Sequence, residues 1–311
     1  MRNYVIYLSL ILPIIAATRP IRFAAHESCT GNLIGLHKKN ILLQPVYFFK
    51  SNSAEPAPQH LLVQSGEQFC GFVLYEKEQQ HVNTWVLYEC KTGITGSFLE
   101  DILLQQEWLK QPFESVTIIE YTKLNTLVPS SLLMPGTEAT VMDFVTGNPQ
   151  QTVALEDRTA VAANLYRVPA TAYVALCHLF QEAKWMHHES LVIDQPATEE
   201  ATITVELWFN TFFLFAEKEG QWLLLQQRSY QTPEDVLYHI LNCKEQWNMG
   251  EDVTVQLQGM VEEHSALYSL LHQYILNLEL NKDLQFYYPS NTSDIPNHTK
   301  QLIDRILTCV S

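Results

Sequence analysis

Glycine-containing turns are the segments of this sequence with the clearest potential for chemistry. Gly66 lies in VQSGEQF, residues 63–69, and Gly259 lies in LQGMVEE, residues 257–263. Glycine lets consecutive backbone N–H groups close around a phosphate, and a nearby carboxylate then holds Mg²⁺ or its waters. Gln64 stands where that carboxylate is needed. Gln64, Gly66 and Gly259 are therefore the candidate nucleotide-loop residues, with ATP and Mg²⁺ as the candidate ligand.

The neighbouring residues argue against phosphate binding. The second phosphate turn of a fold with such turns corresponds to VELWFNTF at 205–212, which has no glycine, and its Trp208 and Phe209 would crowd a phosphate. Gly259 is followed by Glu262 and Glu263, whose carboxylates would repel a phosphate tail. These substitutions predict degenerate turns, and the sequence indicates no catalytic residue.

Histidines and carboxylates show no metal-binding spacing. His187, His188 and Glu189 are consecutive, so their side chains do not converge on one ion, and the pattern is typical of a solvated turn or a structural motif. His264 and His272 are eight residues apart on one predicted helix, too far for a shared ion. The sequence has no P-loop, G-x-S-x-G or H-E-x-x-H motif. We therefore expect no metal site.

The elements that would position these turns form two similar series. GFVLYEKEQ at 71–79 is echoed by FFLFAEKEG at 212–220. Each belongs to three strand-like runs followed by a helix, a strand and a further segment. The first helix spans 97–111 with Ser97 as N-cap. Its counterpart spans 232–247, with Thr232, Pro233 and Asp235 forming a capping-box start. The paired points are Phe72/Phe213, Trp108/Trp247 and Val116/Val253.

Two copies of a βββαβα unit, at 60–135 and 202–278, predict a duplicated α/β fold of the ribonuclease-H-like, actin-like kind, with a cleft between the halves. The first half is expected over 59–199, with an insertion of strands and loops at 137–169 and a helix at 170–185. The second half is expected over 200–289. Residues 290–311 are expected to form a C-terminal tail helix.

The first 58 residues differ from the rest in charge. They hold six basic and two acidic residues, a net of +4, whereas the other 253 hold 13 basic and 32 acidic residues, a net of −19. The apolar run at 4–17 resembles a secretory signal cleaved after Ala17, but the segment also fits a wrongly assigned start, an unstructured extension or a membrane anchor. We expect residues 1–55 to pack little against the rest, because they lack a periodic apolar face.

Charge and cysteine use restrict compartment and partners. A net charge of −15 excludes a passive nucleic-acid binder, which needs clustered Lys and Arg. The six cysteines include no C-x-x-C pair, and reduced thiols buried in a core favour the cytoplasm. Membrane contact is expected only if residues 4–17 act as a signal or an anchor.

Several segments resemble a bacterial family, the domain of unknown function 3822, found mainly in Bacteroidetes. The resemblance rests on TLVPSSLL (126–133), YRVPATAYVALCHLF (166–180), HHESLV (187–192), YQTPEDVLYHIL (230–241) and VQLQGMVEEHSALYSLLHQYI (255–275). It covers roughly residues 60–289 and implies an actin-like ATPase fold. It implies no activity. Members of the family usually begin near the equivalent of residue 50–60, so the N-terminal extension departs from the pattern.

An actin-like fold with degenerate turns predicts a non-catalytic binding or scaffold module with an unidentified protein partner. One alternative is a divergent ATPase or phosphotransferase that uses Gly66 and the inter-lobe cleft. Another is an exported envelope protein, if the first 17 residues are a working signal.

Overall fold

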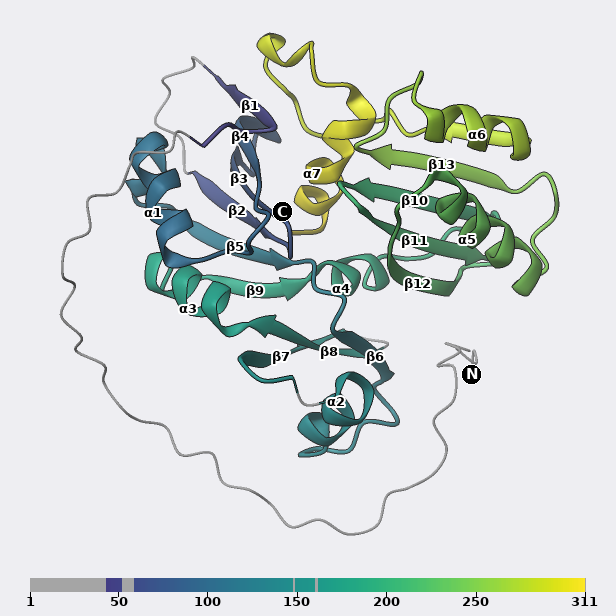
Figure 1. Cartoon of the computed structure of the whole chain (residues 1–311), viewed down its shortest axis with the longest axis horizontal. Coiled ribbons are helices and arrows are strands. Elements are labelled where there is room, and N and C mark those ends of the chain that lie inside the picture. Colours follow the sequence, from purple (N-terminus) through teal and green to yellow (C-terminus); the bar gives the residue numbers. More distant parts are fainter. Residues whose placement is uncertain (1–42, 52–58, 148, 160–161, 311) are drawn as a thin grey trace.

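The computed structural model describes residues 43–51, 59–147, 149–159 and 162–310. These residues form two α/β lobes side by side, with the C-terminal helix α7 between them and a small third sheet below the first lobe (Figure 1). The expectations about a signal, anchor or alternative start at 1–42 lie outside the described residues.

The first lobe is built around a six-stranded sheet with the order β1-β4-β3-β2-β5-β9. Its elements, with those inserted after β5, are β1 (Tyr47–Lys50), β2 (His60–Ser65), β3 (Phe69–Glu76), β4 (His81–Glu89), α1 (Gly96–Gln105), η1 (Glu107–Lys110), β5 (Ser115–Glu120), β6 (Asn125–Pro129), α2 (Glu138–Thr146), β7 (Thr152–Arg158), β8 (Ala162–Pro169), α3 (Ala170–Leu179), β9 (Lys184–His187) and α4 (His188–Ile193).

The second lobe is built around a five-stranded sheet with the order β12-β11-β10-β13-β14. Its elements, with the C-terminal segment, are β10 (Thr202–Trp208), β11 (Thr211–Lys218), β12 (Gln221–Ser229), α5 (Pro233–Gln246), β13 (Thr254–Gly259), α6 (Ala266–Tyr274), β14 (Asn277–Leu280), η2 (Ser290–Thr292) and α7 (Asn297–Val310).

The predicted duplication is confirmed, and each unit is one strand longer than predicted. The order β4-β3-β2-β5-β9 matches β12-β11-β10-β13-β14, with three antiparallel strands followed by two parallel ones. The last strands, β9 and β14, have four residues each. β9 begins inside the helix predicted at 170–185, and β14 begins inside the apolar helical pattern that carries His264 and His272 and extends to residue 278. Four residues are too few to show a strand period beside a helical pattern.

The predicted correspondence between residues of the two halves is wrong by one position in the hairpins β2–β3 and β10–β11. Phe72 lies opposite Val63, and both pack under the helices of the first lobe. Phe213 lies opposite Glu206 and faces the other lobe, whereas Leu214 lies opposite Val205. Leu214 is therefore the counterpart of Phe72. A slip of one residue exchanges the two faces of a strand.

Local sequence explains where the long helices begin. Thr95, not Ser97, caps α1, and its Oγ1 accepts a hydrogen bond from the Phe98 N–H at 3.2 Å. The predicted capping box of α5 is confirmed, because Asp235 accepts the Thr232 N–H at 2.9 Å. Pro233 occupies the first turn, where a missing N–H costs nothing.

Strand β1 corrects the predicted boundary at residue 58. It pairs antiparallel with β4, and Phe49 is only 3% exposed. Residues 47–50 therefore belong to the sheet, and the expectation of little packing is wrong for them. Burial alternates along this strand, with Phe48 exposed and Phe49 buried, but the residue types do not, because three aromatic residues are consecutive, so the sequence shows no strand period.

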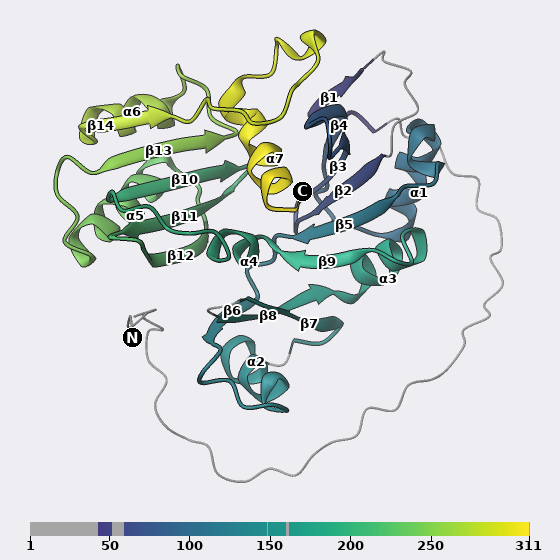
Figure 2. The ribbon, with the colours of Figure 1, turned by 180° about the vertical axis from the view of Figure 1, so that it is seen from behind.

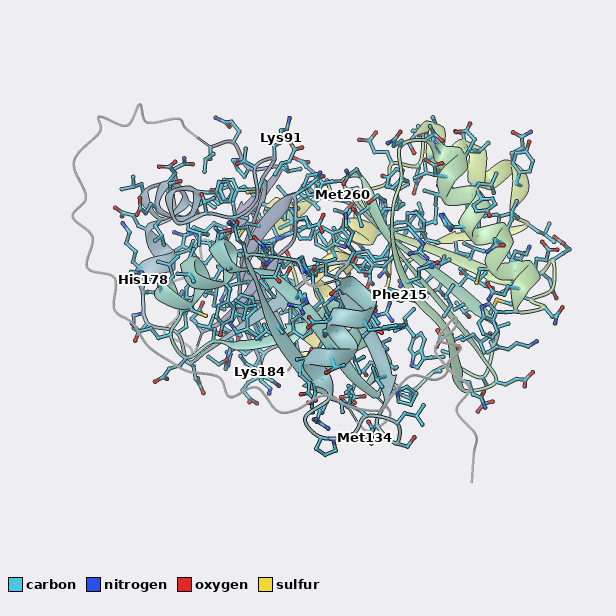
Figure 3. All side chains as sticks on the ribbon, turned by 60° about the horizontal axis from the view of Figure 1, so that its bottom comes forward. Lys91, Met134, His178, Lys184, Phe215 and Met260 are labelled. Carbon is cyan, nitrogen blue, oxygen red and sulfur yellow. The ribbon has the colours of Figure 1, made fainter. Side chains whose placement is uncertain are left out.

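The insertion begins earlier than predicted and contains a helix. β6, β8 and β7 form a three-stranded sheet beneath α2, around a small core of Leu133, Met142, Ala163 and Leu165. In Figure 3, Met134 lies at the outer tip of this subdomain. The insertion therefore starts with β6 at residue 125, not at 137.

The predicted tail helix is part of the central core. Leu302, Ile303, Ile306 and Leu307 of α7 are buried in a hydrophobic cluster that draws residues from both lobes. The view from behind also places α7 between the two sheets (Figure 2). Within the described part of the chain, no helix combines the length and apolar character needed to cross a membrane.

Candidate functional site

The first predicted nucleotide turn, between β2 and β3, is closed by an aromatic ring. Gly66 donates its backbone N–H to Phe69 O at 3.0 Å. A Cβ atom at Gly66 would lie 2.4 Å from the Phe69 ring, so glycine is required here for the ring to lie over the turn. Gly66, which the sequence suggested as a phosphate-binding residue, is therefore explained by the packing of the Phe69 ring.

Gln64 is fully buried and binds the central helix. Its Nε2 donates to the backbone oxygen of Leu302 in α7 at 3.2 Å and lies 3.3 Å from the Tyr121 hydroxyl. Its Oε1 has no hydrogen-bond partner among the described residues. The Gln64 side chain therefore joins the first lobe to α7.

The second turn, between β10 and β11, carries Phe209 in the left-handed backbone region, with φ of 37°. A bulky residue is rare in this conformation. Tyr230 stabilises the turn by donating its hydroxyl to Phe209 O at 2.8 Å, and the Phe209 N–H lies 3.5 Å from Met260 Sδ. The Tyr230 hydroxyl and the Met260 sulfur thus hold the turn in this conformation.

Aromatic rings fill the space between the two turns. Phe69 stacks on Trp208 with ring centroids 4.4 Å apart and planes inclined by 9°. The ring centroids of Phe209 and Tyr121 lie 5.8 Å and 5.1 Å, respectively, from that of Phe69. The cavity that remains beside them measures about 100 Å³, well below the roughly 300–1,000 Å³ of small-molecule sites. Trp208 and Phe209 thus lie at the predicted hairpin.

Gly259 marks the point where α7 approaches the second sheet. Its φ is +94°, and a Cβ atom there would lie 2.3 Å from Leu207 O and 2.9 Å from Leu302 Cδ2. Thr299 of α7 donates its hydroxyl to Gly259 O at 3.0 Å. The close approach of the β10 backbone at Leu207 and of Leu302 in α7 therefore requires glycine at this position.

Glu206 is a buried carboxylate at the junction of the two lobes with α7, and the search for glycine-containing turns did not identify it. It is 1% exposed and accepts hydrogen bonds from Trp208 Nε1 at 2.7 Å and Gln258 Nε2 at 2.9 Å. His188 Nε2 lies 3.2 Å from its Oε1. Burial acts to raise the pKa of Glu206, but the charge interaction and hydrogen bond with His188 outweigh it and lower the pKa. The sequence signal was the acid two residues before Trp208.

Glu120 is a second buried carboxylate at the end of β5. Ser65 donates its hydroxyl to Glu120 Oε2 at 2.7 Å. Burial raises the pKa of Glu120 to about 8, although this hydrogen bond acts in the opposite direction. Glu120 is therefore largely protonated at neutral pH, and a metal ion would have to displace this proton before the carboxylate could bind it.

The consecutive residues His187, His188 and Glu189 are buried, so the solvated-turn interpretation is wrong and the structural one holds. His187 Nε2 lies 2.8 Å from Thr122 O, and its Nδ1 accepts the Glu189 N–H at 3.1 Å. Burial lowers the pKa of His187 to about 3. This neutral ring is consequently held in one orientation.

The same segment anchors the inserted subdomain. Asn164 of β8 lies 3.0 Å from His187 Nδ1, and Asn125 of β6 donates to Glu189 at 2.7 Å. Asp157 of β7 accepts the His187 N–H at 2.6 Å. Within the described ranges, no group of three or more His, Cys, Asp or Glu side chains could hold a metal ion.

A larger groove of about 770 Å³ lies elsewhere, beside β5 and β9. Its lining includes Val116, Phe180, Lys184, Met186 and Val310, and none of Gln64, Gly66 and Gly259. This groove is therefore separate from the predicted nucleotide turns.

Two duplicated lobes with matching strand order and a helix between them define the class of actin-like ATPase folds. A protein of unknown function from Bacteroides thetaiotaomicron with this fold superposes with a TM-score of 0.65 and 15% identity, over 81% of this chain and 96% of that chain. The PilM-PilN type IV pilus biogenesis complex contains a chain that superposes with a TM-score of 0.53 and 10% identity, over 82% of this chain and 97% of that chain.

The chain belongs to the family described as protein of unknown function (DUF3822), whose model matches residues 50–278. The comparison with curated proteins gives no match. Fold and family therefore agree with the expectation from the sequence, and neither carries an activity.

Proposed function

We propose that this protein is a non-catalytic binding or scaffold module with an actin-like fold. The observation that carries the proposal is the stack of Phe69 on Trp208, at 4.4 Å, between the two turns that would hold phosphates. Rings in van der Waals contact leave no room for a phosphate chain between them. A nucleotide could bind there only if this buried stack were broken.

ATP with Mg²⁺, the ligand implied by the fold, does not fit the residues present. Gln64 supplies a single amide oxygen and no carboxylate, and its Nε2 is held by Leu302 O. Glu120 is held neutral by burial, and Glu206 is engaged by three side chains. Hard cations need free oxygen ligands, preferably carboxylates. The polar groups at the junction serve to join the lobes and α7.

One structural relative gives this proposal independent support. The PilM-PilN complex contains a chain of this fold together with a partner protein. A binding role for the same fold therefore has a precedent, although the low identity carries no partner over to this chain.

A thermal-shift titration with ATP and Mg²⁺ tests the proposal. A ligand at 100-fold excess over its Kd stabilises a protein by about 2.7 kcal/mol, which is easily seen. We expect no shift with ATP·Mg²⁺ or ADP·Mg²⁺ at millimolar concentration, and no release of phosphate. A saturable shift together with hydrolysis would favour the alternative, a divergent ATPase or phosphotransferase acting at the junction.

Cytoplasmic placement remains part of the proposal, and an exported envelope protein is its rival. Mass spectrometry of the native N-terminus separates them. A chain that starts at Thr18 supports export, whereas a start near residue 50 supports a cytoplasmic protein without the extension.

A further inference from the structure

Strand β12 is the free edge of the second sheet. It has nine residues, QWLLLQQRS, and pairs with β11 on one side, while no described strand lies on its other side. Both views place it at the outer boundary of that sheet (Figures 1 and 2). The other edges of the two large sheets, β1, β9 and β14, have four residues each. A long unpaired edge is a template for a further strand.

The duplication identifies β4 as the counterpart of β12. Both are third strands of their units, both have nine residues, and both contain the extra residue of a β-bulge at the same place, Asn83 in β4 and Leu223 in β12. In the first lobe the bulge falls between Leu74 and Tyr75, and in the second between Ala216 and Glu217. Trp85 of β4 accordingly corresponds to Leu225 of β12.

The outer edge of β4 is covered, whereas that of β12 is free. β1 pairs antiparallel with residues 84–87 of β4, and Val46 donates its N–H to Leu87 O at 2.7 Å. Seven of the nine β4 residues are buried, while seven of the nine β12 residues are half-buried and two are exposed. The two sheets therefore differ by one strand at this edge.

The backbone of β12 is oriented to accept such a strand. Tyr230 donates its N–H to Asn210 O at 2.9 Å. Because bonded and non-bonded pairs alternate along an antiparallel ladder, Gln226 and Leu224 also direct their backbone groups toward β11. Leu225 and Gln227 then direct theirs to the free edge. Leu225 matches Trp85, which lies between the bonding positions Asn83 and Leu87 of β4.

Apolar side chains along β12 are left incompletely covered. Trp222 and Leu225 pack partly against the central core, and Leu223 and Leu224 pack partly against the core beneath α5. In the first lobe, Tyr47 of β1 completes the equivalent surface by stacking on Trp85 with centroids 5.4 Å apart.

We propose that the free edge of β12 binds an extended segment of a partner protein as an antiparallel sixth strand. The proposal rests on the proposed binding function and names its site. By the β1 register, two large apolar side chains of the segment, two residues apart, lie opposite Gln227 and Leu225, as Tyr47 and Phe49 lie opposite Leu87 and Trp85.

The charge of β12 adds one specificity position. Arg228 is exposed and is the one charged residue of the strand. The residue before the first apolar position lies opposite it, so an acidic side chain fits there. The preferred pattern is acidic, apolar, any residue, apolar. A second copy of this chain is a poorer occupant, because each copy carries a net charge of −15.

Fluorescence anisotropy with a labelled, end-capped peptide, Ser-Glu-Tyr-Thr-Phe-Thr-Ser, tests the proposal on the full chain. We expect saturable binding that Leu225→Pro weakens by about tenfold or more relative to Leu225→Ala. Both variants lose the leucine side chain, but only proline removes the N–H that faces the free edge. Since that N–H makes no bond to β11, the ladder survives the substitution.

A charge exchange gives a second measurement that does not depend on proline being tolerated. Arg228→Glu should weaken binding of the peptide, and a peptide with Lys in place of Glu should bind this variant better than the parent protein. Absence of saturable binding, or equal binding by the Pro and Ala variants, overturns the proposal. A dimer of the protein that Leu225→Pro dissociates also overturns it, in favour of a second copy. These outcomes are distinct from failure of the proposed function, which a shift with ATP·Mg²⁺ would reveal.

Discussion

Gln64 and Glu206 occupy equivalent positions in the two halves and face each other's lobe across the junction. Gln64 lies in β2 beside Ile119 of β5, and Glu206 lies in β10 beside Gln258 of β13. Gln64 binds the backbone of α7, whereas Glu206 contacts His188. The two positions that the fold offers for a metal-binding carboxylate thus serve to hold the lobes and α7 together.

Replacing Glu206 with Gln tests that structural role. The change leaves His188 and Trp208 Nε1 facing an amide, and weakening the buried hydrogen bonds of a carboxylate costs about 1–3 kcal/mol. Because the pKa of Glu206 is lowered in the folded protein, its ionised carboxylate stabilises the fold at pH values above the ordinary carboxyl pKa. This stabilisation is lost as pH falls through the folded-state pKa. Urea unfolding at pH 7 and pH 4 should therefore show a smaller loss from Glu206→Gln at the lower pH. Glu263→Gln, at an exposed pair with Lys282, is the matched control and should change little.

Glu120→Gln should alter the pH dependence of stability in the opposite direction. Because the folded-state pKa of Glu120, about 8, lies above its unfolded value, wild-type stability from this group is present below pH 4.5 and lost as pH rises toward 8. A glutamine does not ionise, so the variant should gain on wild type by up to about 1.4 kcal/mol per pH unit in that window. Unfolding measured at pH 5, 6, 7 and 8 checks this. A constant difference would show that Glu120 is ionised in the folded protein.

Sequence patterns predicted the fold better than the residue pairing. Strands with strong aromatic and aliphatic content, such as β3 and β11, were recognised, and so was the capped helix α5. The echo of EKE at 76–78 and 217–219 fixed the pairing by identity and set Phe72 against Phe213. The bulges show that Phe72 corresponds to Leu214. Similar residues on opposite faces of a strand cannot be told apart without the partner strand.

The candidate site was predictable only in part. Degenerate turns followed from Gln64 and from Trp208, whose bulk is visible in the sequence. The roles of Gly66 and Gly259 did not follow from the sequence. Gly66 is required by the orientation of the Phe69 ring, and Gly259 is required by contacts with Leu207 and with Leu302 of α7, which are distant from it in the sequence. Glu206 escaped notice because its partner His188 comes from the other lobe.

Gly259→Ala should be strongly destabilising, and Gly136→Ala supplies its control. Both glycines have positive φ, of +94° and +84°, so each substitution pays the strain of a left-handed backbone, about 1–2 kcal/mol. A Cβ atom at Gly136 meets nothing within 4 Å, whereas at Gly259 it would lie 2.3 Å from Leu207 O. We expect an additional cost of about 1–3 kcal/mol for Gly259→Ala from overpacking. Equal midpoints in urea for the two variants would contradict the close approach of Leu207 in β10 and Leu302 in α7 to Gly259.

Gln64→Asp decides whether the first turn retains a latent metal site. A carboxylate introduced at the Mg²⁺ position of an otherwise competent turn should create nucleotide binding. Here the side chain is fully buried and donates to Leu302 O, so Asp would remove the donor and bring a charge into the core. We expect a loss of about 2–4 kcal/mol and no thermal shift with ATP·Mg²⁺, even when Trp208→Gly and Phe209→Thr are added to open the second turn. Gln64→Met, of similar size and uncharged, should cost less, because it leaves one unsatisfied carbonyl but buries no charge. If Gln64→Asp were as stable as Gln64→Met and bound ATP·Mg²⁺, the turn would be a nucleotide site that lacks only its carboxylate, and α7 would have to give way to the ligand.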